Sequence, residues 1–79
     1  MSEQEEVIIK LTKNEALVLF EFLARTNEVD HPELFVDQAE LKILWLLEGQ
    51  LERQLAEPFL KNYSSIVAEA RNRLRDEEQ

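Results

Sequence analysis

The chain has 79 residues with nine basic and 17 acidic side chains, and it contains one glycine, two prolines and no cysteine. A chain of this length forms one domain as a rule, and the shortage of turn-forming residues argues for helices over an all-β fold. Without cysteine there is no disulfide or thiolate metal site, and one histidine cannot build a multi-histidine site. We therefore expect a mostly α protein without a metal or cofactor.

The formal net charge of −8 is concentrated at the two ends of the chain. Residues 1–6 and 76–79 hold six of the acidic side chains and no basic one, so we predict acidic tails, the first disordered, around a single helical domain over 7–75. Overall acidity repels phosphate backbones, which makes nucleic acid an unlikely partner. The N-terminus lacks the features of a signal peptide, and no apolar run approaches the roughly 20 residues of a membrane span. We expect a cytoplasmic protein.

Residues 7–11 open the predicted domain with a β-branched, apolar run that is typical of a short strand. Thr12 and Glu15 then have the spacing of a capping box, in which each side chain binds the other residue's backbone N–H. The first helix is predicted from about 13 to 27, where Asn27 is a plausible stop.

The predicted strand needs a partner, because one strand cannot stand alone. Residues 34–36, which follow a loop around Pro32, are apolar and form a second candidate strand. The alternative is that another subunit supplies the pairing.

The second helix begins with a repeat of the capping signature. Asp37 is the predicted N-cap and Glu40 its reciprocal partner, and the helix is expected to run to about Glu57, where Pro58 blocks it. This helix and the first one both carry apolar residues well outside a single stripe, which is more apolar surface than a surface helix normally shows.

The surplus apolar side chains form the candidate interface: Phe22, Ile43, Trp45 and Leu46. Two interpretations are open. The helices can pack into a tight monomeric core that leaves Ile43 and Leu46 simply exposed, or these second faces can bind a partner or a second copy of the chain. We favour the second interpretation and expect a homodimer.

Three further residues, Glu48, Gly49 and His31, need separate hypotheses. Glu48 lies inside the apolar stripe of the second helix, so we predict a buried carboxylate that is paired structurally or serves as a perturbed acid. Gly49 falls in mid-helix, where it either allows close approach of another backbone, marks a kink, or is merely tolerated. His31 is read as a surface loop histidine, because no nucleophile or second base accompanies it.

A third helix is predicted from about Asn62 or Tyr63 to about Asp76, with Asn62 as the N-cap. Arg71 and Arg75 share one face of this helix and form a candidate anion contact. The acidic residues nearby would neutralise much of their field, so solvated ion pairs are the more ordinary interpretation.

The sequence also resembles a known group of proteins in its helix and capping motifs. Residues 11–23, with the LTxxEALVLFEFL pattern, and residues 35–40 and 44–48 are similar to short, uncharacterised bacterial all-α proteins. The resemblance implies a bacterial, cytosolic protein and lends no activity, cofactor or catalytic residue.

Because no catalytic motif is present, we do not expect an enzyme. The preferred function is a small acidic protein-interaction module, of a regulator, antitoxin-like or immunity-like kind, that docks through apolar helix faces. The alternative is a nucleic-acid-binding regulator that uses the arginines of the third helix.

Overall fold

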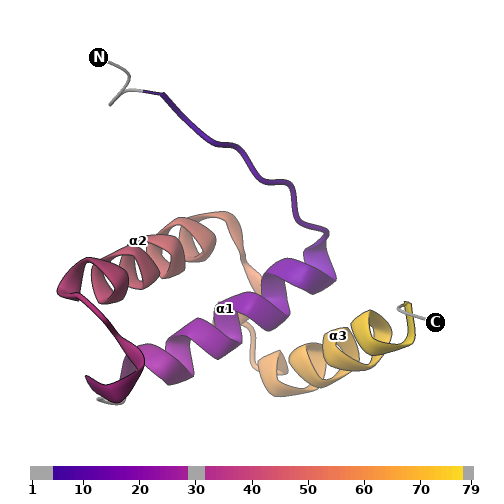
Figure 1. Ribbon diagram of the computed structural model, residues 1–79. Coiled ribbons are helices and arrows are strands. Elements are labelled where there is room, and N and C mark those ends of the chain that lie inside the picture. The colour runs from indigo at the N-terminus through magenta and orange to yellow at the C-terminus, as the bar shows by residue number, and fades with distance from the viewer. Residues whose placement is uncertain (1–4, 29–31, 78–79) are drawn as a thin grey trace.

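The computed structural model describes residues 5–28 and 32–77 and is mostly α-helical, as predicted. Three α-helices, each about four turns long, are separated by two single-turn 3₁₀-helices (Figure 1). In chain order the elements are α1 (Lys13–Glu28), η2 (Pro32–Leu34), α2 (Gln38–Gln54), η3 (Glu57–Phe59) and α3 (Tyr63–Glu77).

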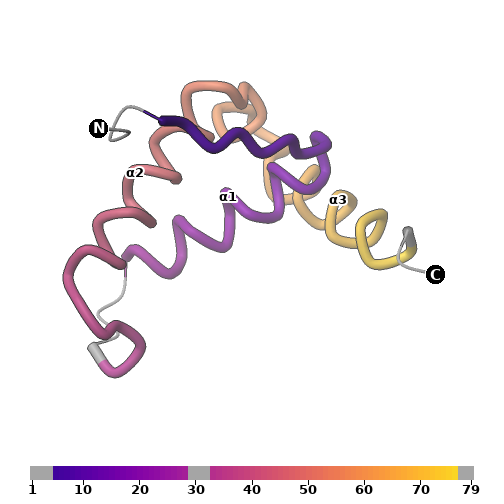
Figure 2. The backbone as a smooth tube through the Cα atoms, turned by 45° about the horizontal axis from the view of Figure 1, so that its top comes forward, coloured from indigo at the N-terminus to yellow at the C-terminus, as the bar shows by residue number. Residues whose placement is uncertain are grey.

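Helix α1 is the centre of the fold. It packs against both α2 and α3, which lie on different sides of it (Figures 1 and 2). Among the described residues, eight hydrophobic ones are buried in the core: Ala16, Leu17, Phe20, Leu23, Leu51, Leu55, Val67 and Ala70. Half of these belong to α1, so α2 and α3 are held chiefly by burying their apolar stripes against this one helix.

The start of α1 confirms the predicted capping box. The backbone N–H of Glu15 donates to Thr12 Oγ1 at 3.2 Å, and the N–H of Thr12 donates to Glu15 Oε1 at 2.8 Å. These bonds satisfy donors that a helix N-terminus leaves without an intrahelical partner. The helix ends at Glu28, one residue beyond the predicted stop.

The start of α2 follows the prediction with one change. Asp37 is the N-cap, and its Oδ1 accepts from the N–H of Ala39 at 2.7 Å. Glu40, however, accepts from the N–H of Val36 at 2.8 Å, one residue before the cap. The carboxylate therefore ties down the chain that enters the helix.

Helix α2 ends at Gln54, earlier than the predicted end near Glu57. Pro58 explains the difference. A proline lacks the N–H for an intrahelical bond, and its ring would collide with the carbonyl four residues back, which belongs to Gln54. The chain turns out of the helix at Leu55, whose backbone is extended and whose side chain is buried.

Neither predicted strand is present among the described residues. Residues 5–12 run out from the start of α1 as an extended stretch without a ladder partner (Figure 1). The proposed partner cannot pair with it, because Leu34 closes the η2 turn and the N–H of Val36 is already bonded to Glu40.

Helix α3 begins within the predicted range. Asn62 contributes its backbone carbonyl, which accepts from the N–H of Ile66 at 3.0 Å. An ion pair between Lys13 Nζ and Glu57 Oε2, 3.0 Å apart, joins the first residue of α1 to η3. In the part of the chain that the structure describes, no helix has the length and apolar character needed to cross a bilayer.

Candidate functional site

Large apolar side chains are unusually exposed in this structure. Among the described residues, more large apolar side chains are exposed than are buried in the core: Val7, Ile8, Ile9, Leu11, Phe22, Leu34, Val36, Ile43, Trp45, Leu46, Phe59 and Leu60. Scattered exposed apolar residues are normal, whereas grouped ones mark interaction surfaces. The positions of these residues on the elements therefore decide which of them form a candidate site.

Two of the predicted interface residues lie together on α2. Ile43 exposes 57% and Leu46 exposes 51% of its surface, and one turn on either side of them lie the exposed Ala39 and Gln50. Spacings of three and four residues place these four side chains on one strip of the helix. We call this strip the outer face of α2. The helix turns its other side, including Leu51, into the core.

Trp45 is also exposed, at 54%, but it lies on the opposite flank of α2 from the outer face. Trp45 lines a shallow groove along the first two turns of the helix together with Gln38, Ala39, Leu41 and Lys42, so the groove borders the outer face at Ala39. Trp45 itself lies outside the strip that holds Ile43 and Leu46. The structure divides the predicted interface between two sides of α2.

Phe22, the fourth predicted interface residue, lies on the exposed side of α1. The guanidinium carbon of Arg25 lies 5.7 Å from the centre of its ring, which is within the range of a cation–π contact. Phe22 still exposes 51% of its surface, as much as Leu46, but it lies on a different helix from Ile43 and Leu46.

Glu48 is half-buried and hydrogen-bonded. Its Oε1 accepts from Asn27 Nδ2 at 2.6 Å, so the carboxylate links the middle of α2 to the last turn of α1. The other side-chain atom of Asn27, Oδ1, is buried without a hydrogen-bond partner. This is the structural pairing that the sequence allowed, although the partner is an amide and not an arginine.

Gly49 lies in an uninterrupted stretch of α2. A Cβ atom built on it would meet only the guanidinium end of Arg53, at 3.9 Å, which is ordinary van der Waals distance. Nothing within the described chain approaches closely enough to require a glycine here.

The arginines of α3 do not converge on one point. Arg73 forms an ion pair with Glu69 at 3.1 Å, and Arg75 donates to Asn72 Oδ1. Arg71 lies in a small hollow beside Tyr63 and Glu21. Each of the three has an acidic or polar neighbour on or next to the helix.

Tyr63 ties α3 to α1. Its hydroxyl donates to Glu21 Oε1 at 3.0 Å. Partial burial, followed by this hydrogen bond and the charge of Glu21, raises the pKa of Tyr63 to about 12, and the nearby Arg71 opposes the rise. Sequence reasoning missed this contact, because 42 residues separate its two partners.

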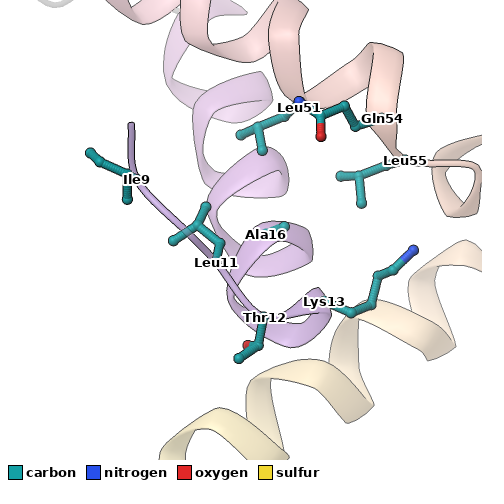
Figure 3. A pocket seen from close by; sticks show the side chains of 8 residues that line it. All are labelled: Ile9, Leu11, Thr12, Lys13, Ala16, Leu51, Gln54 and Leu55. Atoms are coloured by element: carbon teal, nitrogen blue, oxygen red, sulfur yellow. The ribbon is translucent and has the colours of Figure 1, made fainter. Parts of the chain in front are cut away.

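Sequence reasoning also left out of the interface the apolar side chains of residues 7–11, which we call the N-terminal segment and which include three consecutive, highly exposed residues, Val7, Ile8 and Ile9. The segment passes Gln50 and Gln54 near the end of α2, and with the start of α1 it borders an open pocket (Figure 3). Figure 3 shows Leu11 beside α1, with Leu51 and Leu55 projecting from α2. The signal that could have identified the segment was its predicted strand character without a partner strand in the same chain.

Two features of the chain remain, potential metal-binding side chains and His31. Within residues 5–28 and 32–77, the structure contains no cluster of three or more side chains suited to hold a metal ion. His31, the predicted loop histidine, lies outside the described residues, as do the ends of both predicted acidic tails.

Comparison of the chain with protein-family models, with curated proteins and with solved structures found no match. The exposed apolar surfaces described above are therefore the basis for the candidate function.

Proposed function

We propose that this protein is a small protein-interaction module that docks a partner protein on the outer face of α2. The observation that carries the proposal is the exposure of Ile43 and Leu46, 57% and 51%, side by side on a helix whose other side is packed in the core. Apolar side chains grouped in this way gain free energy when a partner removes them from water.

The anchoring of α2 supports this proposal. The helix is capped by Asp37, tied to its entering chain by Glu40 and held to α1 by Glu48. A surface presented on a helix that is already ordered costs less conformational entropy on binding than a surface that must fold first. Most of the free energy gained when a partner buries a side chain of α2 can therefore appear as binding affinity.

The charge distribution bears on the kind of partner. A net charge of −8 steers the chain toward neutral or basic proteins and away from nucleic acid. The acidic and polar neighbours of the α3 arginines also favour a protein partner over a phosphate backbone. We place the protein in the cytoplasm as a regulator, antitoxin-like or immunity-like inhibitor, without catalytic activity.

The test is capture of the partner by the full chain and by a variant with a charged outer face. Ile43→Lys/Leu46→Lys places two lysines on the outer face, and the matched control Ser65→Lys/Ala68→Lys adds the same charges at the same spacing on exposed positions of α3. We expect a stoichiometric protein partner that binds wild type and control equally. Its affinity for the outer-face variant should fall at least about tenfold, because central apolar interface residues carry most of the binding energy.

Far-ultraviolet circular dichroism of both variants checks that the helices are retained. The proposal is wrong if the outer-face variant binds the partner as tightly as wild type does. Captured material that is destroyed by nuclease and lost with Arg71→Ala/Arg75→Ala would instead support the nucleic-acid alternative.

A further inference from the structure

We infer that the N-terminal segment, residues 7–11, forms a β-strand when it pairs with the same segment of a second copy of this chain. The two strands are antiparallel, with Ile9 opposite Ile9. The result is a homodimer with an intermolecular two-stranded sheet. The inference goes beyond the proposed function, because it rests on different residues from the outer face of α2, and the two can fail separately.

The first argument is the exposure of the segment. Val7, Ile8 and Ile9 expose 91%, 80% and 77% of their surface, the largest exposure of any run of consecutive apolar residues that the structure describes. Within the described part of the chain, no backbone hydrogen bond involves residues 5–11. The segment therefore presents both apolar side chains and unsatisfied backbone groups, as an unpaired edge strand does.

The second argument is that the chain already supplies a layer for such a sheet to pack on. Alternate residues of a strand point to the same side, so Val7, Ile9 and Leu11 share one face. Ile9 and Leu11 line the pocket that α1 and α2 border with Ala16 and Leu51 (Figure 3). A two-stranded sheet is marginal in water alone but becomes stable when one face packs on helices.

The third argument is that the segment is self-complementary about its centre. When two copies of residues 7–11 overlap fully in antiparallel orientation, Ile9 lies on the twofold axis and Val7 lies opposite Leu11 of the other copy. Every directly opposed pair on this face is then apolar, and β-branched and aliphatic pairs stabilise such ladders. A shift by one residue would break the overlap and move the apolar face.

Charge complementarity selects the antiparallel orientation. Glu6 directly precedes the segment and Lys10 lies near its other end; both are exposed, and both belong to the face opposite that of Ile9. In the antiparallel register Glu6 of one copy lies diagonally across from Lys10 of the other, twice per dimer. A parallel register would place Glu6 beside Glu6 and Lys10 beside Lys10, and such like-charge pairs are unfavourable.

The first experiment measures the mass of the full chain by sedimentation equilibrium over a range of concentrations. We expect wild type to approach twice the chain mass of 9.3 kDa. Ile9→Lys places two like charges together on the axis and should raise the dimer dissociation constant at least about tenfold. The matched control Val36→Lys, at a residue 92% exposed elsewhere, should leave the constant unchanged.

A charge-reversal cycle tests the orientation. Glu6→Lys and Lys10→Glu each turn two attractive pairs into repulsive ones, so each should weaken the dimer about tenfold at low salt. The double variant Glu6→Lys/Lys10→Glu restores opposite charges and should recover most of the affinity. If the double variant loses as much dimer affinity as the two single variants lose together, the antiparallel pairing is overturned.

Disulfide trapping tests the register directly, because the chain has no cysteine of its own. In an equal mixture of the Val7→Cys and Leu11→Cys variants, oxidation should give mainly the mixed disulfide, since these positions face each other in the proposed sheet. Homodisulfides in place of the mixed product would overturn the register.

The mass measurements also separate this inference from the proposed function. A wild type of 9.3 kDa at every concentration overturns the dimer and leaves docking on α2 untouched. A dimer that survives Ile9→Lys but is lost with Ile43→Lys/Leu46→Lys overturns the strand pairing and assigns self-association to the outer face of α2. Loss with Ile9→Lys alone supports the inference.

Discussion

Helices α1 and α2 are nearly the same length and similarly rich in apolar residues, yet they are buried to very different degrees. Helix α1, with 16 residues, buries Ala16, Leu17, Phe20 and Leu23, whereas α2, with 17 residues, buries only Leu51. The difference follows from position. Helix α1 has a neighbour on two sides, and α2 packs chiefly against α1 alone.

The apolar residues of the two helices therefore have different roles, one in the core and one at the surface. On α1 they supply the core. On α2 only Leu51 joins that core, to which α3 adds Val67 and Ala70, and Ile43 and Leu46 remain in solvent. The sequence shows the surplus of apolar surface, and the arrangement of the helices shows that Ile43 and Leu46 share one exposed strip of α2.

Truncation of one leucine on each helix tests this difference in burial most directly. Leu23→Ala should lower the free energy of unfolding by about 2–5 kcal/mol, because Leu23 is only 2% exposed and its removal leaves a cavity. Leu46→Ala, at 51% exposed, should cost less than about 1 kcal/mol. Urea denaturation at one fixed protein concentration measures both.

A loss of similar size for the two variants would show that the outer face of α2 is buried in solution. A small domain has a total stability of only about 5 kcal/mol, so Leu23→Ala is also expected to bring the chain close to unfolding.

Gly49 offers a smaller test, on α2 alone. Gly49→Ala should raise the free energy of unfolding by about 0.5–1 kcal/mol, because alanine restricts the unfolded chain and its Cβ meets only Arg53 at 3.9 Å. Thermal unfolding of the variant beside wild type gives the value. If a partner's backbone packs closely on this position, the same variant should gain stability while it loses affinity.

The last test concerns α3, the second neighbour of α1, and its effect appears only at high pH. Because the pKa of Tyr63 is raised to about 12 from a usual value of 10.0, the folded state prefers the neutral phenol. The stability that this preference contributes is complete below about pH 10 and should be lost as the pH rises toward 12. Absorbance of the phenolate reports it cleanly, since Tyr63 is the only tyrosine.

Glu21→Gln is the matched variant for this titration. It removes the charge and weakens the hydrogen bond that assist burial in raising the pKa of Tyr63. The midpoint should therefore move back toward 10. An unchanged midpoint would mean that burial alone accounts for the shift.

Local signals were the part of the fold that sequence reasoning predicted well. The Thr12–Glu15 capping box and the Asp37 cap depend on residues within three positions of each other, so their spacing alone predicts their bonds. The helix over 13–28 was predicted to within one residue for the same reason.

Features that depend on distant partners were predicted less well. The strand over 7–11 was wrong for the isolated chain, because strand propensity does not supply a neighbouring strand. The end of α2 was placed too late, because the ring of Pro58 acts four residues upstream. Glu48 was predicted to be buried but is half-buried, and its partner Asn27 comes from another helix.

The central position of α1 has a consequence for how the molecule opens. Since α2 and α3 each pack mainly against α1 and hardly against each other, either outer helix can detach while the remaining pair stays folded. Opening of α1 itself requires both contacts to break at once. The amide protons of α1 should therefore exchange with solvent most slowly, which makes this helix the last element of the fold to lose its structure.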